Sequence, residues 1–375
     1  MAVWPVVTID MADDAIDERW MRAALSLARR GLGRTWPNPT VGCIIVKDGM
    51  PAGQGWTQPD GRPHAETEAL DRAGDAAVGA TAYVTLEPCN HYGRTPPCSK
   101  ALADAGIARV VVACTDPDPR VAGAGLDTLR SRGVEVRLGV LENEARDVNA
   151  GFLKRQEQRL PHITLKLATT LDGRIATASG ESQWITNSQA RRFGHYLRAI
   201  SDAILVGRGT AIADNPSLTC RLAGLEDRTP VRIVLDTKAS LPDGLTLFDG
   251  TTETWHVVGA GAGGSPERLA VNRVEVALGA DGRNDTAATI SAIAELGITR
   301  LLVEGGGTVA AALLDAKLVD EIAWFTAPTL IGGDGVAGIG GLSVQRIADM
   351  HSFREISSRQ LGSNTLTVYR REEGN

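Results

Sequence analysis

The sequence has few cysteines, no long apolar run and no excess of basic residues. Its five cysteines are an odd, sparse set for 375 residues, so they predict no disulfide framework and favour a reducing, cytoplasmic compartment. No apolar run reaches the ~18 residues needed to cross a bilayer. The formal net charge is −6, which argues against non-specific binding to nucleic acid or to a membrane surface. Any phosphate that the chain binds must therefore be held by local groups.

The N-terminal segment also lacks the features of a secretory signal. Residues 1–17 contain four aspartates and no lysine or arginine, whereas a signal peptide begins with a basic region. Met11 offers a second start, and we expect residues 1–10 to be an extension without a structural role.

The length predicts two domains, at about 150 residues per domain. In the first, residues 1–150, strands alternate with helices of about ten residues, which predicts a layered α/β domain with mostly parallel strands. Residues 17–30 place apolar side chains on one helical face, with Asp17 as the N-cap and Gly31 as the stop. The further expected strands are 41–46, one near Ala52, 82–86, 110–113 and 134–138, and the further expected helices begin near His64 and Cys98 and span 126–132.

A second α/β pattern follows a polar, charged stretch at 143–161, which predicts a second domain over residues 151–375. Its expected strands are 163–168, 203–206, 231–235, 254–258, 274–278, 300–303 and 321–327, and its expected helices are 188–199, 286–296 and 309–316.

The strongest chemical signal is a set of metal ligands in the first domain. His64-Ala65-Glu66 is followed by Pro88-Cys89 and, after eight intervening residues, by Cys98. One imidazole and two thiolates suit Zn²⁺ and leave a fourth position for water, whose pKa zinc lowers. We assign Glu66 as the proton shuttle. This order of residues is typical of zinc deaminases, although their usual cysteine spacing is Cys-x-x-Cys.

Two structural alternatives apply to these residues. The site could hold a purely structural zinc ion, or the cysteines could be buried as small apolar side chains. Cys43, Cys114 and Cys220 have no such neighbours in the sequence and are expected to be packing residues.

Longer motifs in the first domain resemble the deaminase domain of the bifunctional RibD family of riboflavin biosynthesis. They are Asn38-Pro39-Thr40-Val41-Gly42, His64-Ala65-Glu66, the run from Pro88 to Cys98 that contains Gly93-Arg94-Thr95-Pro96-Pro97, and the run from Asp116 to Gly123. The resemblance implies a cytidine-deaminase-like three-layer domain, a pyrimidine pocket lined by Asn38, and Arg94 on the ribose phosphate. Two residues depart from the family pattern: Asn90 replaces a common serine, and Asp118 replaces a common asparagine.

The second domain resembles the reductase domain of the same family, which implies a dihydrofolate-reductase-like α/β fold and NADPH as cofactor. The motifs are the run from Lys166 to Arg174, Gly180–Thr186, Val206–Thr210, Ala213–Arg221 and Val303–Thr308. In the last of these, three glycines precede a helix, so backbone N–H groups can approach an anion there. The spacing is not Gly-x-Gly-x-x-Gly, which argues against a Rossmann site. A glycine-rich tight turn is the alternative.

The resemblance also implies roles for single residues of the second domain. On the NADPH side it places Ala168, Trp184, Thr210, Asp214, Thr237 and Gly306. On the substrate side it places Ser182, Arg198, Leu218, Arg221 and Glu304, with the two arginines suited to a phosphate. Reduction needs a proton donor, for which Lys166, Asp214 and Glu304 are candidates. The alternative for Lys166 and Glu304 is a structural ion pair.

Together these features predict a bifunctional enzyme with one zinc ion per chain. It would deaminate a phosphorylated diaminopyrimidine and then reduce its ribosyl side chain with NADPH, and the resemblance implies a homodimer formed through the reductase domain. Two other classes fit less well. A binding protein that had lost catalysis would have a damaged ligand set, and a nucleic-acid base deaminase would have a basic groove and the shorter cysteine spacing.

Overall fold

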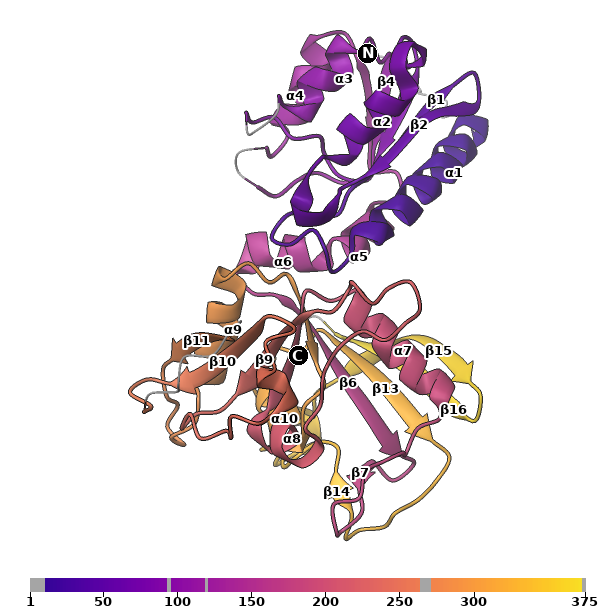
Figure 1. Cartoon of the computed structure of the whole chain (residues 1–375). Helices are drawn as coiled ribbons and strands as arrows, with labels where there is room; N and C mark the ends of the chain where they lie inside the picture. The colour runs from indigo at the N-terminus through magenta and orange to yellow at the C-terminus, as the bar shows by residue number, and fades with distance from the viewer. Residues whose placement is uncertain (1–10, 93–95, 119–120, 264–270, 373–375) are drawn as a thin grey trace. The chain divides into compact units, whose positions relative to one another are not determined.

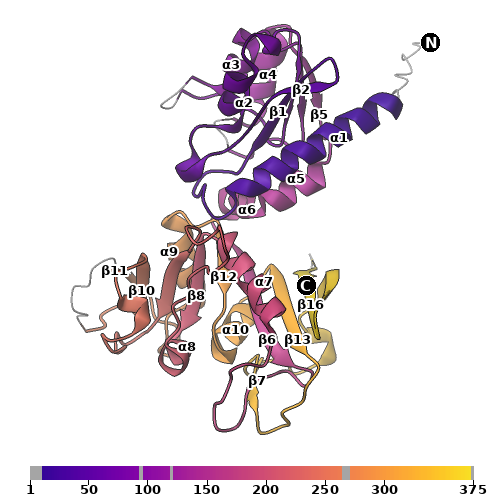
Figure 2. The same ribbon diagram turned by 45° about the vertical axis from the view of Figure 1, so that its right-hand side comes forward.

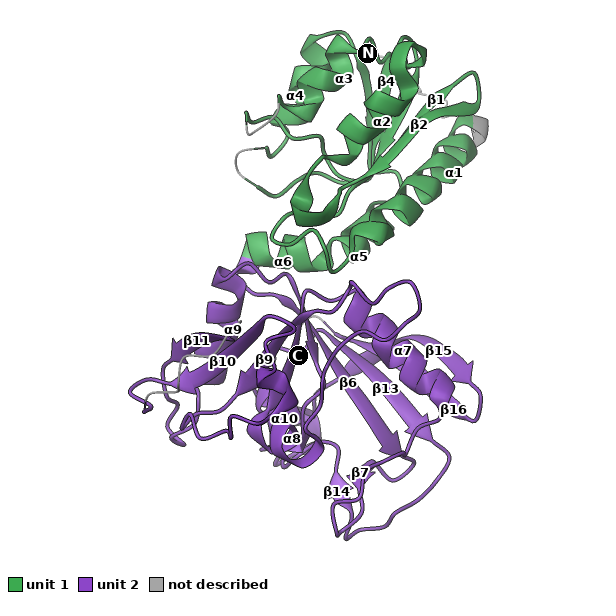
Figure 3. Cartoon of the chain, viewed as in Figure 1, with its two compact units in different colours: residues 1–157 green, residues 158–375 purple. Residues whose placement is uncertain are grey.

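The computed structural model describes residues 11–92, 96–118, 121–263 and 271–372 (Figure 1). The chain folds as two compact units, Met1–Glu157 and Gln158–Asn375 (Figure 3). Within the described ranges, every helix is too short or too polar to cross a bilayer.

The first unit is built around a five-stranded sheet in the order β2-β1-β3-β4-β5. Strands β3, β4 and β5 are parallel, and β1 is antiparallel to both of its neighbours. The strands are β1 (Gly42–Lys47), β2 (Met50–Trp56), β3 (Thr81–Val84), β4 (Arg109–Val112) and β5 (Glu135–Leu138). The helices are α1 (Met11–Ala28), α2 (Ala65–Ala73), α3 (Cys98–Asp104), α4 (Ala124–Ser131), α5 (Glu142–Val148) and α6 (Ala150–Gln158), with 3₁₀ turns at Arg29–Gly31, Pro59–Gly61 and Gly74–Ala77.

Helices cover both faces of this sheet, as Figure 2 shows with α1 and α5 on one side and α2, α3 and α4 on the other. Glycines in the first two strands allow this close packing. A Cβ on Gly42 would lie 1.9 Å from the Ala24 carbonyl oxygen of α1, and one on Gly55 would lie 2.3 Å from that of Ala65 in α2. The first unit is therefore a three-layer α/β domain, as the sequence predicted.

The predicted role of Asp17 as an N-cap is wrong. Helix α1 runs through Asp17 from Met11, and the carboxylate is buried. It accepts hydrogen bonds from the Arg109 guanidinium at 2.8 Å and from the Tyr83 hydroxyl at 3.0 Å, and it pairs with Arg137 at 2.7 Å. These partners replace the solvent around the charge, so Asp17 fixes the helix to the sheet and leaves the backbone helical.

The second unit contains a nine-stranded sheet in the order β11-β10-β9-β8-β12-β6-β13-β16-β15. The strands from β11 to β13 are parallel, and the last two are antiparallel. The strands are β6 (His162–Thr170), β8 (Ala203–Gly207), β9 (Val231–Leu235), β10 (Thr254–Gly259), β11 (Val271–Val276), β12 (Arg300–Val303), β13 (Glu321–Ala327), β15 (Phe353–Leu361) and β16 (Asn364–Arg371), and β7 (Arg174–Ala176) pairs separately with β14 (Val336–Ala337). The helices are α7 (Ser188–Ala199), α8 (Arg208–Asp214), α9 (Thr286–Glu295) and α10 (Gly307–Asp315), with 3₁₀ turns at Thr246–Phe248 and Ile347–Asp349.

The α/β pattern of this unit follows the sequence prediction in its parallel part. The expected strand at 274–278 lies earlier, at Val271–Val276, and the β15–β16 hairpin was not predicted. Its first strand forms the sheet edge and is exposed along most of its length, so it lacks the buried alternation that marks a strand in a sequence.

Candidate active sites in the two units

The metal ligands of the first unit come from two helix starts and one loop. His64 occupies the position before α2, Cys98 is the first residue of α3, and Cys89 follows Pro88 in the loop after β3. A backbone hydrogen bond from Ser99 N–H to the Cys89 carbonyl oxygen (3.2 Å) ties this loop to α3. The fold thus brings together residues that are up to 34 positions apart in the sequence.

Their geometry fits zinc. His64 Nδ1 lies 3.2 Å from Cys98 Sγ and 3.6 Å from Cys89 Sγ, and the three ligand atoms are all within 4.8 Å of one another. Nitrogen and sulfur ligands of a tetrahedral zinc ion are about 3.6 Å apart. Among the described residues, no other group of three His, Cys, Asp or Glu side chains meets this criterion.

The two thiols have opposite pKa shifts. Hydrogen bonds from Cys98 and from His64 lower the pKa of Cys89 to about 4, although burial acts to raise it. The same thiol–thiol hydrogen bond, together with burial, raises the pKa of Cys98. One thiolate is therefore already favoured by the protein, and thiolate is the form that binds zinc.

Glu66 lies beside these ligands in the first turn of α2. Its side chain is buried, and it is within hydrogen-bonding reach of Cys98. Burial raises the pKa of Glu66 to about 7, although the charge of His64 opposes the shift. A carboxyl group with a pKa near neutrality can both accept and return a proton.

Two side chains that the sequence analysis did not assign to the site hold the surrounding loops. The Glu87 carboxylate accepts hydrogen bonds from the backbone N–H groups of Asp116, Gly123, Gly125 and Leu126 at 3.0–3.3 Å. Asn90 Oδ1 accepts from the hydroxyls of Ser99 (2.8 Å) and Thr128 (3.1 Å). Asn90 thus connects the cysteine loop to α3 and α4 in place of the serine common in the family.

Asn38 and Asp118, which were also predicted for the first unit, are not among the grouped metal ligands. Asn38 is exposed, and its side chain packs on Gly61, where a Cβ would lie 2.2 Å from Asn38 Nδ2. Asp118 is buried, and its N–H donates to Asp116 Oδ1 at 2.9 Å. Arg94 lies outside the described residues. The other three cysteines are buried, as predicted: Cys43, Cys114 and Cys220.

A cavity of about 610 Å³ in the second unit collects most of the residues predicted there. Its walls come from β6, the segment before α7, α7 itself, the segment after α8, and the end of β12. The predicted residues that line it are Lys166, Ala168, Ser182, Trp184, Arg198, Thr210, Asp214, Leu218, Arg221 and Glu304.

Three charged side chains form one network in this cavity. Arg198 donates from Nε to Glu304 Oε1 (2.8 Å) and from an Nη to Oε2 (3.0 Å), and Lys166 Nζ lies 3.3 Å from Oε2. Burial acts to raise the pKa of Glu304, but the charges and hydrogen bonds of Arg198 and Lys166 outweigh it and hold that pKa well below its usual range. The ion pair offered as the structural alternative is thus present, and it lies in the cavity wall.

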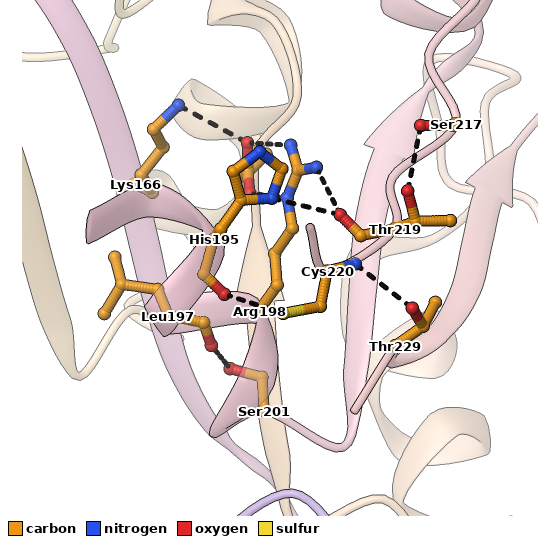
Figure 4. A network of polar contacts seen from close by, with 10 residues as sticks. Lys166, His195, Leu197, Arg198, Ser201, Ser217, Thr219, Cys220 and Thr229 are labelled. Atoms are coloured by element: carbon orange, nitrogen blue, oxygen red, sulfur yellow. Dashed lines mark hydrogen bonds and ion pairs between the residues drawn. The ribbon is translucent and has the colours of Figure 1, made fainter. Parts of the chain in front are cut away.

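The two arginines predicted for a phosphate differ in their surroundings. The Arg198 guanidinium is committed to Glu304 and to the Thr219 carbonyl oxygen, which it reaches at 3.0 Å (Figure 4). Arg221 is exposed and has no ion pair or hydrogen bond within the part of the chain that the structure describes. Arg221 is therefore the better placed of the two to bind an anion.

A second cavity of about 980 Å³ contains the remaining predicted residues, Thr237 and Gly306. Thr210 lines both cavities, and its hydroxyl accepts a hydrogen bond from Gly306 N–H at 3.0 Å. The glycines between β12 and α10 allow close approach of backbones, because a Cβ on Gly305 would lie 2.9 Å from Gly207 N and Val206 Cα. Adjoining cavities that share a wall residue suit an extended dinucleotide beside a second ligand.

His195 lines the smaller cavity and was not predicted. It lies on α7 three residues before Arg198, and a single histidine at a helical position carries no local signal of function. Its place in the cavity depends on the packing of α7 against the segment that contains Thr219.

Both units match known protein families. Residues 14–114 match the cytidine and deoxycytidylate deaminase zinc-binding region, and residues 161–367 match the RibD C-terminal domain. The riboflavin biosynthesis protein RibD of Escherichia coli is 44% identical over 359 residues, which are 92% of this chain and 97% of that protein.

Solved structures agree over both units. RibD of Acinetobacter baumannii superposes with a TM-score of 0.86 at 38% identity and covers 96% of this chain and 100% of its own. A Thermotoga maritima diaminohydroxyphosphoribosylaminopyrimidine deaminase/5-amino-6-(5-phosphoribosylamino)uracil reductase gives 0.86 at 34% identity, with the same coverage. The chain therefore belongs to the RibD family, and it is a bifunctional enzyme of riboflavin biosynthesis that joins a zinc-binding deaminase domain to a reductase domain of the NADPH-dependent RibD type.

Proposed function

We propose that the two units catalyse consecutive steps on one phosphorylated pyrimidine. The first unit hydrolyses the 2-amino group of 2,5-diamino-6-ribosylamino-4(3H)-pyrimidinone 5′-phosphate. The second reduces the ribosyl side chain of that product with NADPH to give 5-amino-6-ribitylaminouracil 5′-phosphate. The observation that carries this proposal is the buried carboxyl group of Glu66 beside a ligand set with zinc-like spacing.

In the first unit, His64, Cys89 and Cys98 would hold the zinc ion. Bound zinc supplies Lewis acidity, which makes water a better nucleophile at neutral pH. Glu66 takes a proton from the attacking water and returns it to the departing amino group, so that ammonia leaves as a neutral molecule. Burial raises the pKa of Glu66, so this carboxyl group holds the transferred proton more readily than an exposed glutamate would.

In the second unit, Lys166 is the better proton donor of the central ion pair. Glu304 stays ionised because its pKa is held low, and so it has no proton to give. The Lys166 ammonium lines the same cavity and is held by Glu304 at 3.3 Å. Asp214, at the end of α8, lines the cavity as well. We propose Glu304 as the group that orients the ammonium, with Arg221 on the substrate phosphate.

The larger cavity and the cavity wall near Trp184 would hold NADPH. Gly306 N–H already donates to Thr210, and Gly307 begins α10, a nine-residue helix whose N-terminus favours negative charge. Ala168, Trp184 and Asp214 extend this path into the smaller cavity, and Thr237 extends it into the larger one. This arrangement would place the reducing end of the cofactor beside the substrate.

We further infer a homodimer formed through the reductase unit and a cytoplasmic compartment. Edge strand β15 presents exposed backbone along one side of the nine-stranded sheet, and such edges pair with other chains. All five cysteines are free thiols, which suits a reducing compartment. Light scattering of the purified protein at micromolar concentration tests the dimer: a monomer mass would contradict it.

Two separate assays test the two halves. Ammonia release from the diaminopyrimidine substrate by the zinc-loaded protein, without NADPH, reports the deaminase. Loss of NADPH absorbance with the deaminated substrate reports the reductase. Activity in both supports the proposal, and inactivity in either contradicts the corresponding half.

A further inference from the structure

His195 places one unused hydrogen-bonding atom in the wall of the smaller cavity. It lies on α7 one turn before Arg198, so both side chains leave the same face of the helix. Figure 4 shows both directed at the Thr219 carbonyl oxygen, which accepts from Arg198 at 3.0 Å and from His195 Nδ1 at 3.1 Å. The cavity also contains Arg221 and Glu304.

The contact with Thr219 determines which ring nitrogen carries hydrogen. A carbonyl oxygen can only accept, so Nδ1 must be the protonated nitrogen. Burial and the positive charges of Arg198 and Arg221 lower the pKa of His195, which keeps the ring neutral. Nε2 therefore has a free lone pair, and it has no hydrogen-bond partner among residues 11–92, 96–118, 121–263 and 271–372.

The position of His195 is fixed by further contacts. Its backbone carbonyl oxygen accepts a hydrogen bond from Cys220 Sγ at 3.6 Å. Cys220 N–H in turn donates to the Thr229 hydroxyl at 3.1 Å, and Ser217 and Thr219 share a hydroxyl–hydroxyl hydrogen bond of 3.1 Å. The segment that orients the imidazole is thus anchored at several points, so Nε2 is held in place before any ligand binds.

The Lys166–Glu304–Arg198 network offers few free acceptors to a ligand, and the other carboxylate of the cavity, Asp214, lies on α8. Lys166 and Arg221 are donors, and both carboxylate oxygens of Glu304 already accept hydrogen bonds from Arg198 and Lys166. A ribosyl chain carries several hydroxyl groups, each of which needs an acceptor when it is buried. A phosphate dianion offers only acceptors, so it suits Arg221 and not a neutral Nε2.

We propose that Nε2 of His195 accepts a hydrogen bond from a hydroxyl group of the ribosyl chain of the reductase substrate, next to the phosphate held by Arg221. The inference rests on the proposed function of the second unit. His195 is thus a substrate-binding residue that recognises the hydroxylated chain. It is not the proton donor, because its donor nitrogen is committed to Thr219 and its other nitrogen carries no proton.

Two substitutions separate the two nitrogens. His195→Asn places an amide nitrogen near the position of Nδ1, so it keeps a donor for Thr219 but removes the acceptor at Nε2. His195→Gln extends further and presents an amide oxygen near the position of Nε2, while the bond to Thr219 is lost. Melting temperature and NADP⁺ binding are the controls for folding of the second unit.

The measurement is calorimetric binding of the deaminated ribosyl substrate to the zinc-loaded protein without NADPH, so that no turnover occurs. We expect His195→Asn to weaken binding about tenfold, the usual effect of one lost hydrogen bond, and to raise KM with little change in kcat. His195→Gln should recover most of the affinity. Binding of inorganic phosphate and of NADP⁺ should be unchanged in both variants.

Other outcomes would overturn the proposal. Substrate affinity of His195→Asn within twofold of wild type contradicts the contact, and an equal loss of inorganic phosphate binding assigns Nε2 to the phosphate instead. If His195→Asn does not fold, His195→Gln decides: retained affinity supports the contact and lost affinity contradicts it. If the wild-type protein does not reduce the deaminated substrate at all, the proposed function itself has failed.

Discussion

At the scale of single residues, function depends on groups that are buried and held by named partners. Glu66 has its raised pKa because it is buried, and Glu304 has its lowered pKa because two cations surround it. The sequence predicted both residues, since each belongs to a motif. It did not predict Glu87, whose backbone partners lie 29 to 39 residues further along the chain, or His195, whose partner Thr219 lies 24 residues away. Contacts of that range have no signature in local spacing.

Replacement of Glu66 by glutamine tests the proton shuttle. We expect deamination to fall by about 10²–10⁴-fold, because the amide cannot accept the proton of water, while zinc content stays near one ion per chain. Ammonia release and metal analysis measure the two effects.

Glu68→Gln is the matched control, since Glu68 lies on the same helix but forms an ion pair with Arg72 at 2.6 Å. It should retain wild-type deamination. Loss of zinc in Glu66→Gln would instead identify Glu66 as a ligand.

At the scale of secondary-structure elements, buried charges and glycines set how helices meet sheets. The sequence predicted a helix at Ser188–Ala199, and α7 has these bounds; in the structure the Asn187 side chain caps it by accepting a hydrogen bond from Ala190 N–H. It misplaced the start of α1, because an aspartate before an apolar helical face resembles a cap, whereas the partners of Asp17 are on β3, β4 and β5. The edge strand β15 escaped prediction because it buries little.

Asp17→Asn should destabilise the first unit at neutral pH by about 3 kcal/mol, because two guanidinium groups, themselves partly exposed, lose the buried charge that they share. Burial alone would raise the pKa of Asp17, but the hydrogen bond and charge of Arg109, with Tyr83 and Arg137, lower it. Because the folded-state pKa is lowered, ionised Asp17 stabilises the fold at pH values above the unfolded-state pKa of about 4. This stabilisation is lost as the pH falls through the folded-state pKa.

The free energy of unfolding, measured with urea, should therefore differ between wild type and Asp17→Asn by an amount that is constant from pH 5 to pH 7 to within about 0.5 kcal/mol. This difference should shrink below about pH 4. A difference that grew on acidification would contradict this assignment.

Gly305→Ala tests the close contact between β8 and the start of α10. The added Cβ would meet backbone atoms at 2.9 Å that cannot rotate away. We expect the free energy of unfolding of the second unit to fall by about 1–3 kcal/mol, which lowers its melting temperature by roughly 3–10 °C.

Gly306→Ala provides the comparison, because its Cβ would lie 3.5 Å from Thr210 Oγ1, an ordinary contact. Its melting temperature should stay within about 2 °C of wild type. Equal losses in both variants would show that the contact with β8 is not what requires glycine.

At the scale of the whole molecule, the groups proposed for the two reactions belong to separate units. The zinc ligands and Glu66 all belong to the first unit, and both cavities with the Lys166–Glu304–Arg198 network belong to the second. The sequence predicted this division of chemistry from two separate motif sets. It could not predict that Arg198 is paired with Glu304, because the two residues are 106 positions apart in the chain.

Loss of the metal site should therefore leave the reductase intact. Cys89→Ala is expected to abolish ammonia release and zinc binding, while NADPH oxidation with the deaminated substrate stays within about twofold of wild type, because no ligand of the metal lines either reductase cavity. Cys114→Ala, which removes a buried thiol outside the metal site, should keep its zinc. A parallel loss of both activities in Cys89→Ala would contradict the independence of the units.

Identification of the products by mass spectrometry tests the two consecutive reactions most directly. The zinc-loaded protein receives the diaminopyrimidine ribosyl phosphate with and without NADPH. We expect one amino nitrogen to be replaced by oxygen in both samples, and the ribosyl side chain to gain two hydrogens only when NADPH is present. Unchanged substrate, or reduction without prior deamination, would contradict this expectation.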